Sequence, residues 1–169
     1  ELDRSVLRRA WDDNENFGFY NLEHPVVGVS WFEANAYCNW LLRHWTELSE
    51  SKANSSLHPR MIRLSLDNEW SIAAGGEIPE ERFPWDAVGN ATADIKEIVK
   101  RANVKESGIG HTTPVNAYLR GASPYGVMDM AGNVWEWQAN SKDIKSGYLG
   151  RRGGSWSSYG DFSRVSVRD

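Results

Sequence analysis

Hydrophobic and polar residues alternate with a helical period in only three stretches of this chain. The longest runs from residue 31 to residue 45, where apolar side chains recur three or four positions apart: Phe32, Ala36, Tyr37, Trp40, Leu41 and Trp45. Ser30 and Glu33 have the spacing of a capping box, so the helix is expected to begin directly after Ser30. We expect its apolar face, which includes Cys38, to lie against the core.

Two shorter helices are predicted further along. Ser65 is placed to cap a helix that continues to Ala74 and stops at the glycine pair 75–76, after a strand-like approach at residues 61–64. The third helical pattern covers residues 94–102.

The remainder of the sequence is irregular. Residues 1–23 predict a lead-in of low structure, and residues 103–160 have little periodicity but many turn signals. Short β-rich runs at residues 134–137, 153–156 and 164–167 predict a small antiparallel sheet. The pattern therefore indicates an α+β domain with two main helices and long ordered loops.

Composition excludes several classes of protein. The chain has 169 residues, which fits one domain, and its net charge of −4 without a basic block argues against nucleic-acid binding. The sequence contains neither an apolar run long enough to span a membrane nor a signal-peptide pattern, so cytoplasmic and cell-surface locations both remain open. The single cysteine excludes a disulfide framework.

Aromatic residues are unusually abundant, with nine Trp, six Tyr and five Phe beside fifteen Gly. Large rigid side chains next to freely turning backbone are typical of a loop-rich fold built on aromatic packing. The same mixture is typical of a surface that binds through aromatic side chains. Composition alone leaves both interpretations open.

Several phrases match one family in order along the chain. They are HPVVGVSW (24–31), AYCNWL (36–41), RLSLDNEW (63–70), FPW (83–85), ANV (102–104), TTPV (112–115), YGVMDMAGNVWEW (125–137) and RGGSW (152–156). Over residues 24–169 the chain resembles the formylglycine-generating enzyme, or sulfatase-modifying factor, domain. The resemblance implies a variant of the C-type lectin fold, with a closing strand that is expected shortly after Asp169.

Catalysis in this family requires residues that the sequence does not offer in the expected place. The resemblance implies that the oxidases carry two cysteines just after the Gly-Gly-Ser segment, because thiolates are soft ligands for Cu(I). Residues 155–164 read SWSSYGDFSR and contain no cysteine. Iron-dependent relatives use a histidine cluster, whereas His24, His44, His58 and His111 are scattered. We therefore expect no copper, no iron and no catalytic residue.

A third branch of the family is similar to this chain in another way. It comprises the variable proteins of diversity-generating retroelements, in which solvent-facing positions near the C-terminus are rewritten. The run 157–163 combines Ser, Tyr, Gly, Asp and Phe, as antibody paratopes do, although an ordinary polar loop could have the same composition. The resemblance implies a variable ligand-binding face made of Gln138, Asn140, Tyr148, Ser157, Ser158, Tyr159, Gly160, Asp161, Phe162, Ser163 and Ser166.

A structural calcium site is also implied by the resemblance. A hard cation takes six to eight oxygen ligands and can cross-link loops that have no disulfide. The first implied ligand set is Asp129, Gly132, Val134 and Glu136, with Gly132 and Val134 acting through backbone carbonyls. A second implied set is Asn103, Val104 and Glu106. The alternative is that these carboxylates accept hydrogen bonds from loop N–H groups without a metal.

The matched phrases sort the tryptophans. Six of them lie in scaffold phrases and are expected in the core: Trp31, Trp40, Trp70, Trp135, Trp137 and Trp156. Trp85 follows Phe83 and Pro84 and is expected to pack as well. The aromatic side chains of a binding surface would then be Tyr159 and Phe162, together with Tyr148.

The sequence favours a non-catalytic protein that binds a protein or a surface glycan, as a monomer and without nucleic acid. One alternative is a metal-dependent oxidoreductase or a fragment of a formylglycine-generating type of enzyme. Another is an accessory module of a multidomain protein.

Overall fold

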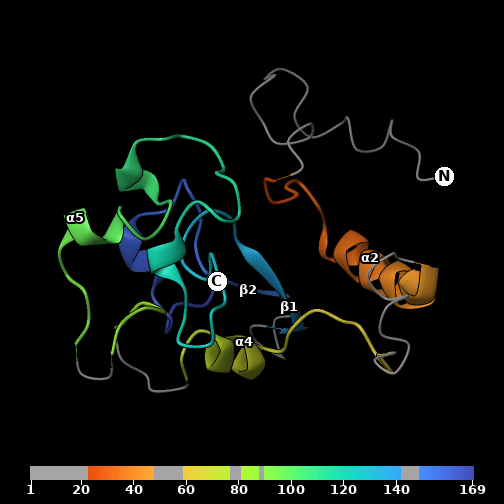
Figure 1. Ribbon diagram of the computed structural model, residues 1–169. Helices are drawn as coiled ribbons and strands as arrows, with labels where there is room; N and C mark the ends of the chain where they lie inside the picture. Colours follow the sequence, from red (N-terminus) through yellow and green to blue (C-terminus); the bar gives the residue numbers. More distant parts are fainter. Residues whose placement is uncertain (1–22, 48–58, 77–80, 88–89, 142–148) are drawn as a thin grey trace.

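A computed structural model of the chain describes residues 23–47, 59–76, 81–87, 90–141 and 149–169. Of the predicted lead-in, residues 1–22 lie outside this part. Figure 1 shows helix α2 (Trp31–His44) on one side of the molecule and α5 (Ile95–Ile98) on the other, with strands β1 (Glu136–Ser141) and β2 (Leu149–Arg152) between them. Irregular loops of the second half of the chain lie mainly on the α5 side of this sheet. Among the described residues, no helix has both the length and the apolar character needed to cross a membrane.

Helix α2 (Trp31–His44) begins where the capping box predicts, and the 3-10 helix η1 (Trp45–Glu47) continues it. Ser30 Oγ accepts a hydrogen bond from Glu33 N at 3.3 Å, and Ser30 N donates to Glu33 Oε2 at 2.7 Å. These two bonds satisfy N–H groups that the first turn of a helix leaves without a partner. The sequence therefore predicted the start of this helix correctly.

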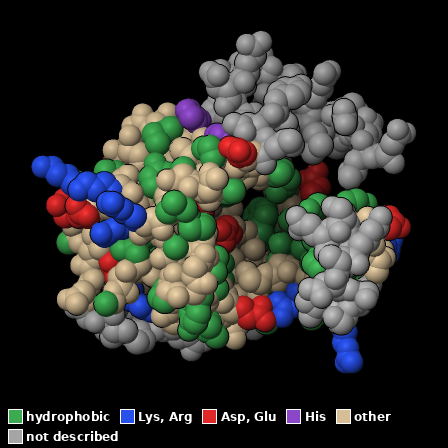
Figure 2. Space-filling model, in the orientation of Figure 1, with side chains coloured by type: hydrophobic (Ala, Val, Ile, Leu, Met, Phe, Trp, Pro, Cys, Tyr) green, Lys and Arg blue, Asp and Glu red, His purple; other side chains and the backbone are tan. Residues whose placement is uncertain are grey.

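The packing of α2 differs from the prediction, because none of its residues is buried. Part of the predicted core face points outward, with Phe32 74% exposed and Tyr37 and Trp40 also exposed. Two indole groups fix this orientation: Trp31 Nε1 donates to Gln138 O at 2.8 Å, and Trp137 Nε1 donates to Val29 O at 3.0 Å. Figure 2 shows a hollow between α2 and the rest of the molecule.

The side of α2 that turns toward the body is only half-buried. Cys38 lies on this side, together with Ala34 and Leu41. On the outer side, the Trp40 ring stacks on Tyr37 and on His44, with centroid distances of 5.8 and 4.9 Å. The helix is thus apolar on both sides, which explains why the sequence pattern could not identify the inner one.

The two other helices are shorter than expected. Helix α4 (Asp67–Ala73) is not capped by Ser65, whose hydroxyl donates to Gln138 Oε1 at 3.2 Å; Glu69 Oε2 instead accepts from Leu66 N at 2.8 Å. Helix α5 (Ile95–Ile98) is capped by Asp94, which accepts from Lys96 N at 2.9 Å. The predicted continuation to residue 102 is a turn.

The sheet consists of two antiparallel strands, β1 (Glu136–Ser141) and β2 (Leu149–Arg152), in which Glu136 lies opposite Arg152. The predicted strand at 134–137 overlaps β1, but residues 153–156 and 164–167 form no strand. The ladder ends at Arg152 because Gly153 and Gly154 have φ values of 91° and 76°, outside the β region. Gly154 also approaches Ser163 so closely that a Cβ would lie 2.3 Å from its hydroxyl.

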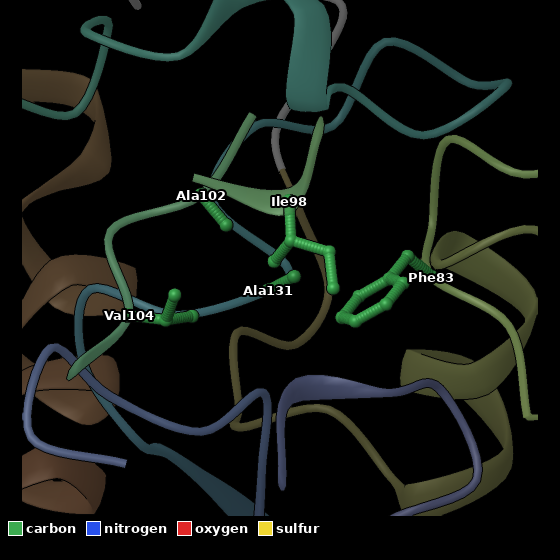
Figure 3. Packing of buried hydrophobic residues seen from close by; sticks show 5 residues of the cluster. All are labelled: Phe83, Ile98, Ala102, Val104 and Ala131. Atoms are coloured by element: carbon green, nitrogen blue, oxygen red, sulfur yellow. The ribbon is translucent and has the colours of Figure 1, made fainter. Parts of the chain in front are cut away.

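The hydrophobic core has two adjoining parts. In the first, side chains from three segments of the chain point toward a common centre (Figure 3): Phe83, Ile98, Ala102, Val104 and Ala131. The second contains Trp70, Ala74, Met130 and Val165. Because Met130 and Ala131 are neighbours in the chain, the loop before β1 links the two parts. The core is therefore built mainly from the irregular second half of the sequence.

The tryptophans occupy the core less than predicted. Trp70 is fully buried, with 2% of its surface exposed. Trp40 is 42% exposed, so its assignment to the core was wrong. The others that the sequence assigned to the core or its packing are half-buried: Trp31, Trp85, Trp135, Trp137 and Trp156.

Candidate functional site

The run that follows Trp156 lies on the surface next to α5. Its second half forms the 3-10 helix η4 (Gly160–Ser163), which lies beside α5 in Figure 1. Tyr159 and Phe162 are 54% and 53% exposed, and Ser157 and Asp161 are also exposed. The two aromatic side chains that the sequence singled out for binding therefore both reach solvent.

The backbone of this run is held by the 3-10 helix η2 (Lys105–Ser107). Lys105 N donates to Ser158 O at 2.9 Å. Gly160 N lies 3.0 and 3.2 Å from the two carboxylate oxygens of Glu106, which accept its hydrogen bond. Lys105 Nζ also contacts Tyr159, at 3.0 Å from the hydroxyl and 4.1 Å from the ring centroid.

Both ends of the run are anchored to the core. Before it, Trp156 N donates to Asn133 O at 3.0 Å. After it, the Arg164 guanidinium pairs with Asp161 at 2.8 Å and lies over the buried Phe83 ring at 4.7 Å. The exposed side chains thus stand on a backbone that is fixed at both ends and in the middle.

The structure does not assemble the whole predicted variable face. Gln138 has no exposed surface: its amide oxygen accepts from Ser65 Oγ and its amide nitrogen donates to Glu136 O. Asn140 is half-buried and accepts from Asp67 N at 2.8 Å. Both residues therefore contact the segment at the start of α4, through Ser65 and Asp67.

Within the run, Gly160 and Ser163 are buried and Ser158 is half-buried. The predicted display of Gln138, Gly160 and Ser163 on the surface was therefore wrong. Ser166 is exposed. Tyr148 lies outside the described residues.

The first predicted calcium set lies at the start of β1. Asp129 Oδ2 accepts from Asn133 Nδ2 at 3.2 Å, whereas Asp129 Oδ1 is buried without a hydrogen-bond partner among the described residues. Glu136 Oε2 accepts from Trp70 Nε1 at 2.5 Å. The backbone turns sharply here, since Asp129 and Asn133 have φ values of 55° and 63°.

Burial changes the acidity of both carboxyl groups. Burial, with a smaller contribution from the charge of Asp129, raises the pKa of Glu136 to about 7, against the hydrogen bond from Trp70. Burial likewise raises the pKa of Asp129 to about 6, against the hydrogen bond from Asn133. Within the described segments, no three His, Cys, Asp or Glu side chains gather as a metal site, so any cation here would depend on backbone oxygens as well.

The residues of the second predicted calcium set have different surroundings: two are buried and one is exposed. Asn103 is fully buried; its amide nitrogen donates to His111 O at 2.8 Å, and its amide oxygen has no partner in the described part of the chain. Val104 is buried in the core. Glu106 is exposed, and its carboxylate accepts from Gly160 N in the run after Trp156.

Two residues at these sites were not found from the sequence. Trp70 was assigned to the core without its hydrogen bond to Glu136, and Lys105 was not considered beside Tyr159. Both contacts join positions more than fifty residues apart, so no local spacing reveals them.

Comparisons with known proteins agree on one family. The model of the sulfatase-modifying factor enzyme 1-like domain matches residues 7–169. The chain is 33% identical over 159 residues to inactive C-alpha-formylglycine-generating enzyme 2 of Bos taurus, covering 87% of this chain and 45% of that protein. It is 33% identical over 127 residues to the formylglycine-generating enzyme of Thermomonospora curvata, covering 69% of this chain and 33% of that protein. The chain thus spans less than half the length of these relatives.

Solved structures with low sequence identity share the fold. Treponema denticola variable protein 1 has a TM-score of 0.66 at 22% identity, over 94% of this chain and 70% of that one. PvdO from Pseudomonas aeruginosa has a TM-score of 0.58 at 24% identity, over 87% of this chain and 56% of that one. At this level of identity the likeness concerns the fold alone.

Proposed function

The chain belongs to the sulfatase-modifying factor enzyme 1-like domain family, and we propose that it is a non-catalytic member that binds a ligand through the exposed run after Trp156. The predicted α+β fold, the C-type lectin variant of this family, is confirmed by the family match and by the solved structures. The proposal depends on one observation: Tyr159 and Phe162 are exposed on a backbone that is hydrogen-bonded to η2.

The side chains of the run suit recognition. Tyr159 and Phe162 supply large rigid contact area at a low cost in conformational entropy, and Ser157 and Asp161 supply adaptable hydrogen bonds. The run contains no cysteine, so it offers no thiolate for copper at the place where the family resemblance implies a cysteine pair in the oxidases. We expect the ligand to be a protein or a surface glycan, and we expect positions in this run to differ between copies of the gene.

The experiment that tests this proposal is sequencing of the gene and its surroundings in many isolates. We expect a reverse transcriptase gene and a template repeat that matches the coding sequence around residues 138–169 but differs at adenines. Substitutions should gather at codons 157, 159, 161 and 162. Equal variation along the whole coding sequence, with no template repeat, would contradict a diversified surface.

The second candidate function is that of an oxidase, which the identity to the Thermomonospora curvata enzyme favours. To separate the two, purified protein would be loaded with Cu(I) and incubated in air with a cysteine-containing peptide. We expect no oxygen uptake above that of a Cys38→Ala control. Oxygen-dependent conversion of the peptide would favour the oxidase instead.

We also propose that Ca²⁺ binds at Asp129 and Glu136, with the carbonyls of Gly132 and Val134. The support is the buried Asp129 Oδ1, which has no hydrogen-bond partner among the described residues, together with a second carboxyl group whose pKa is raised by burial. A divalent cation would neutralise both charges and join the loop that contains Met130 to β1.

Calcium binding is tested by thermal unfolding at pH 7.5, with about 2 mM CaCl2 in one sample and an excess of chelator in the other. We expect Ca²⁺ to raise the melting temperature by several degrees, and Glu136→Gln to remove that increase. Glu97→Gln, which changes an exposed carboxylate on α5, should leave the calcium effect intact. Identical melting of the native chain with and without Ca²⁺ would leave hydrogen bonding as the better account.

A further inference from the structure

Two hydrogen bonds from η2 hold backbone groups of the run 157–163. We propose that η2 is a clamp that fixes the backbone of this run whatever its exposed side chains are, and that Glu106 is the positioning residue of the clamp. The inference deepens the proposed function, on which it rests, because it identifies the positions that can determine specificity.

The clamp acts on backbone atoms. Lys105 N donates to the carbonyl of residue 158, and the Glu106 carboxylate accepts from the amide of residue 160. Every residue has the carbonyl, and every residue except proline has the amide. These two bonds therefore place the same backbone under different sets of side chains.

The clamp itself stands on the core. Val104, directly before η2, is 1% exposed and belongs to the same buried cluster as Phe83 and Ile98. Ser107 closes η2, since its hydroxyl accepts from Val104 N at 2.9 Å and donates to Ala102 O at 3.3 Å. Glu106 is thus presented from a turn that is fixed at both ends.

The seven positions of the run divide by their surroundings. Four side chains are exposed and make no contact on which the clamp depends: Ser157, Tyr159, Asp161 and Phe162. Ser163 is fully buried, and a Cβ on Gly160 would already lie 3.4 Å from Ile98. Ser158 is half-buried, with its hydroxyl 3.0 Å from Ser155 Oγ. Exchange at these four positions would alter specificity and leave both backbone bonds of the clamp in place, but exchange of Asp161 would also remove its ion pair with Arg164.

Lys105 contributes a constant element to this surface. Its ammonium is exposed and lies against Tyr159, and no carboxylate of the described residues forms an ion pair with it. When residue 159 is exchanged, that contact changes but the positive charge stays at the edge of the run. Ligands would therefore meet one fixed cation beside four exchangeable side chains.

Amide hydrogen exchange of Gly160, followed by NMR in the full chain without ligand, tests the clamp. We expect Glu106→Ala to raise the exchange rate of the Gly160 amide about tenfold, because a hydrogen bond to a charged acceptor is lost. Glu106→Gln keeps a carbonyl acceptor and should retain most of the protection. Glu97→Ala, the matched control, removes an exposed carboxylate that pairs with Lys100 and should leave the Gly160 rate unchanged. Unchanged exchange in Glu106→Ala would overturn the proposal.

A second pair of variants tests the division of positions. The double variant Tyr159→Ser, Phe162→Ser should keep the Gly160 protection and melt within about 2 °C of the native chain, as surface substitutions usually do. Ser163→Leu should lose the Gly160 protection and melt at a clearly lower temperature, because a larger side chain does not fit at this fully buried position. Loss of Gly160 protection in the double variant would show that the clamp depends on side chains, and would overturn it. Neither measurement involves a ligand. The absence of variation at codons 157–162 would therefore contradict the proposed function but would not contradict the clamp.

Discussion

Asn133 connects several segments of the irregular second half through its side chain and its backbone. Its amide oxygen accepts from Thr113 N at 2.9 Å, and its amide nitrogen donates to Thr113 O and to Asp129 Oδ2. Its backbone donates to Asn103 O at 2.7 Å and accepts from Trp156 N. A left-handed φ of 63°, which asparagine tolerates, lets one residue face all of these neighbours.

We expect Asn133→Ala to lower the free energy of unfolding by about 3 kcal/mol, because it leaves buried backbone groups of Thr113 without partners. Chemical denaturation measures this change. Asn133→Gly is the matched control, since glycine adopts the left-handed conformation without strain. If Asn133→Gly is as stable as the native chain, backbone conformation and not the amide is what the fold requires there.

The carboxyl groups of Asp129 and Glu136 lead to a prediction for pH. Their folded pKa values of about 6 and about 7 lie above the ordinary values of 3.8 and 4.5, so the folded state binds more protons in between. Stability from these groups is therefore greatest below pH 4 and is lost as the pH rises to about 7. In the presence of chelator, we expect unfolding at pH 5.5 to require about 2 kcal/mol more than at pH 7.5.

The double variant Asp129→Asn, Glu136→Gln provides the comparison for this pH effect. It should remove the rise in stability between pH 7.5 and pH 5.5, as measured by denaturation at each pH. A slope that persists in the double variant would assign the effect to other groups.

At the scale of elements, α2 shows how little packing a correctly predicted helix can have. Its capping box forms, but its attachment to β1 relies on the crossed indole bonds of Trp31 and Trp137. We expect Trp31→Phe to cost about 1 kcal/mol, because it removes one hydrogen bond and leaves Gln138 O without that donor.

Phe32→Ala is the matched substitution on the outer side of α2. Phe32 is 74% exposed, so this change should cost less than Trp31→Phe although it removes a whole ring. Thermal unfolding of the two variants compares them. A larger loss for Phe32→Ala would mean that the outer side of α2 is covered in solution.

At the scale of the whole molecule, Arg152 joins the C-terminal segment to α4. Its guanidinium pairs with Asp67 at 2.6 Å and donates to the carbonyls of Val165 and Val167, both at 2.9 Å. It is 6% exposed, so these partners replace water entirely. The three bonds explain why residues 164–167 bend around a side chain and do not form a strand.

We expect Arg152→Lys to lower the free energy of unfolding by about 3 kcal/mol, since an ammonium cannot reproduce three bonds of a planar fork and stays buried. Arg63→Lys is the control, because Arg63 pairs with Glu69 at the surface. It should have little effect, as is usual for exposed ion pairs. Equal stability of Arg152→Lys and the native chain would exclude a structural role for the fork.

The local features of the fold could be predicted from the sequence. The start of α2, the position of α4 before Gly75 and the irregular second half follow from capping residues, periodicity or turn chemistry, whereas Tyr159 and Phe162 were singled out by the family resemblance. These depend on neighbours a few positions apart, which the sequence states directly.

Tertiary structure alone decided which face of each element is covered. The sequence could not show that α2 turns Trp40 outward, that β1 buries Gln138, or that Glu106 holds Gly160. Each of these depends on a partner dozens of residues away, and an apolar or polar side chain has the same local pattern whichever partner it meets. The sequence by itself therefore determined the family and the fold class, whereas the contacts that hold the run after Trp156 in place required the tertiary structure.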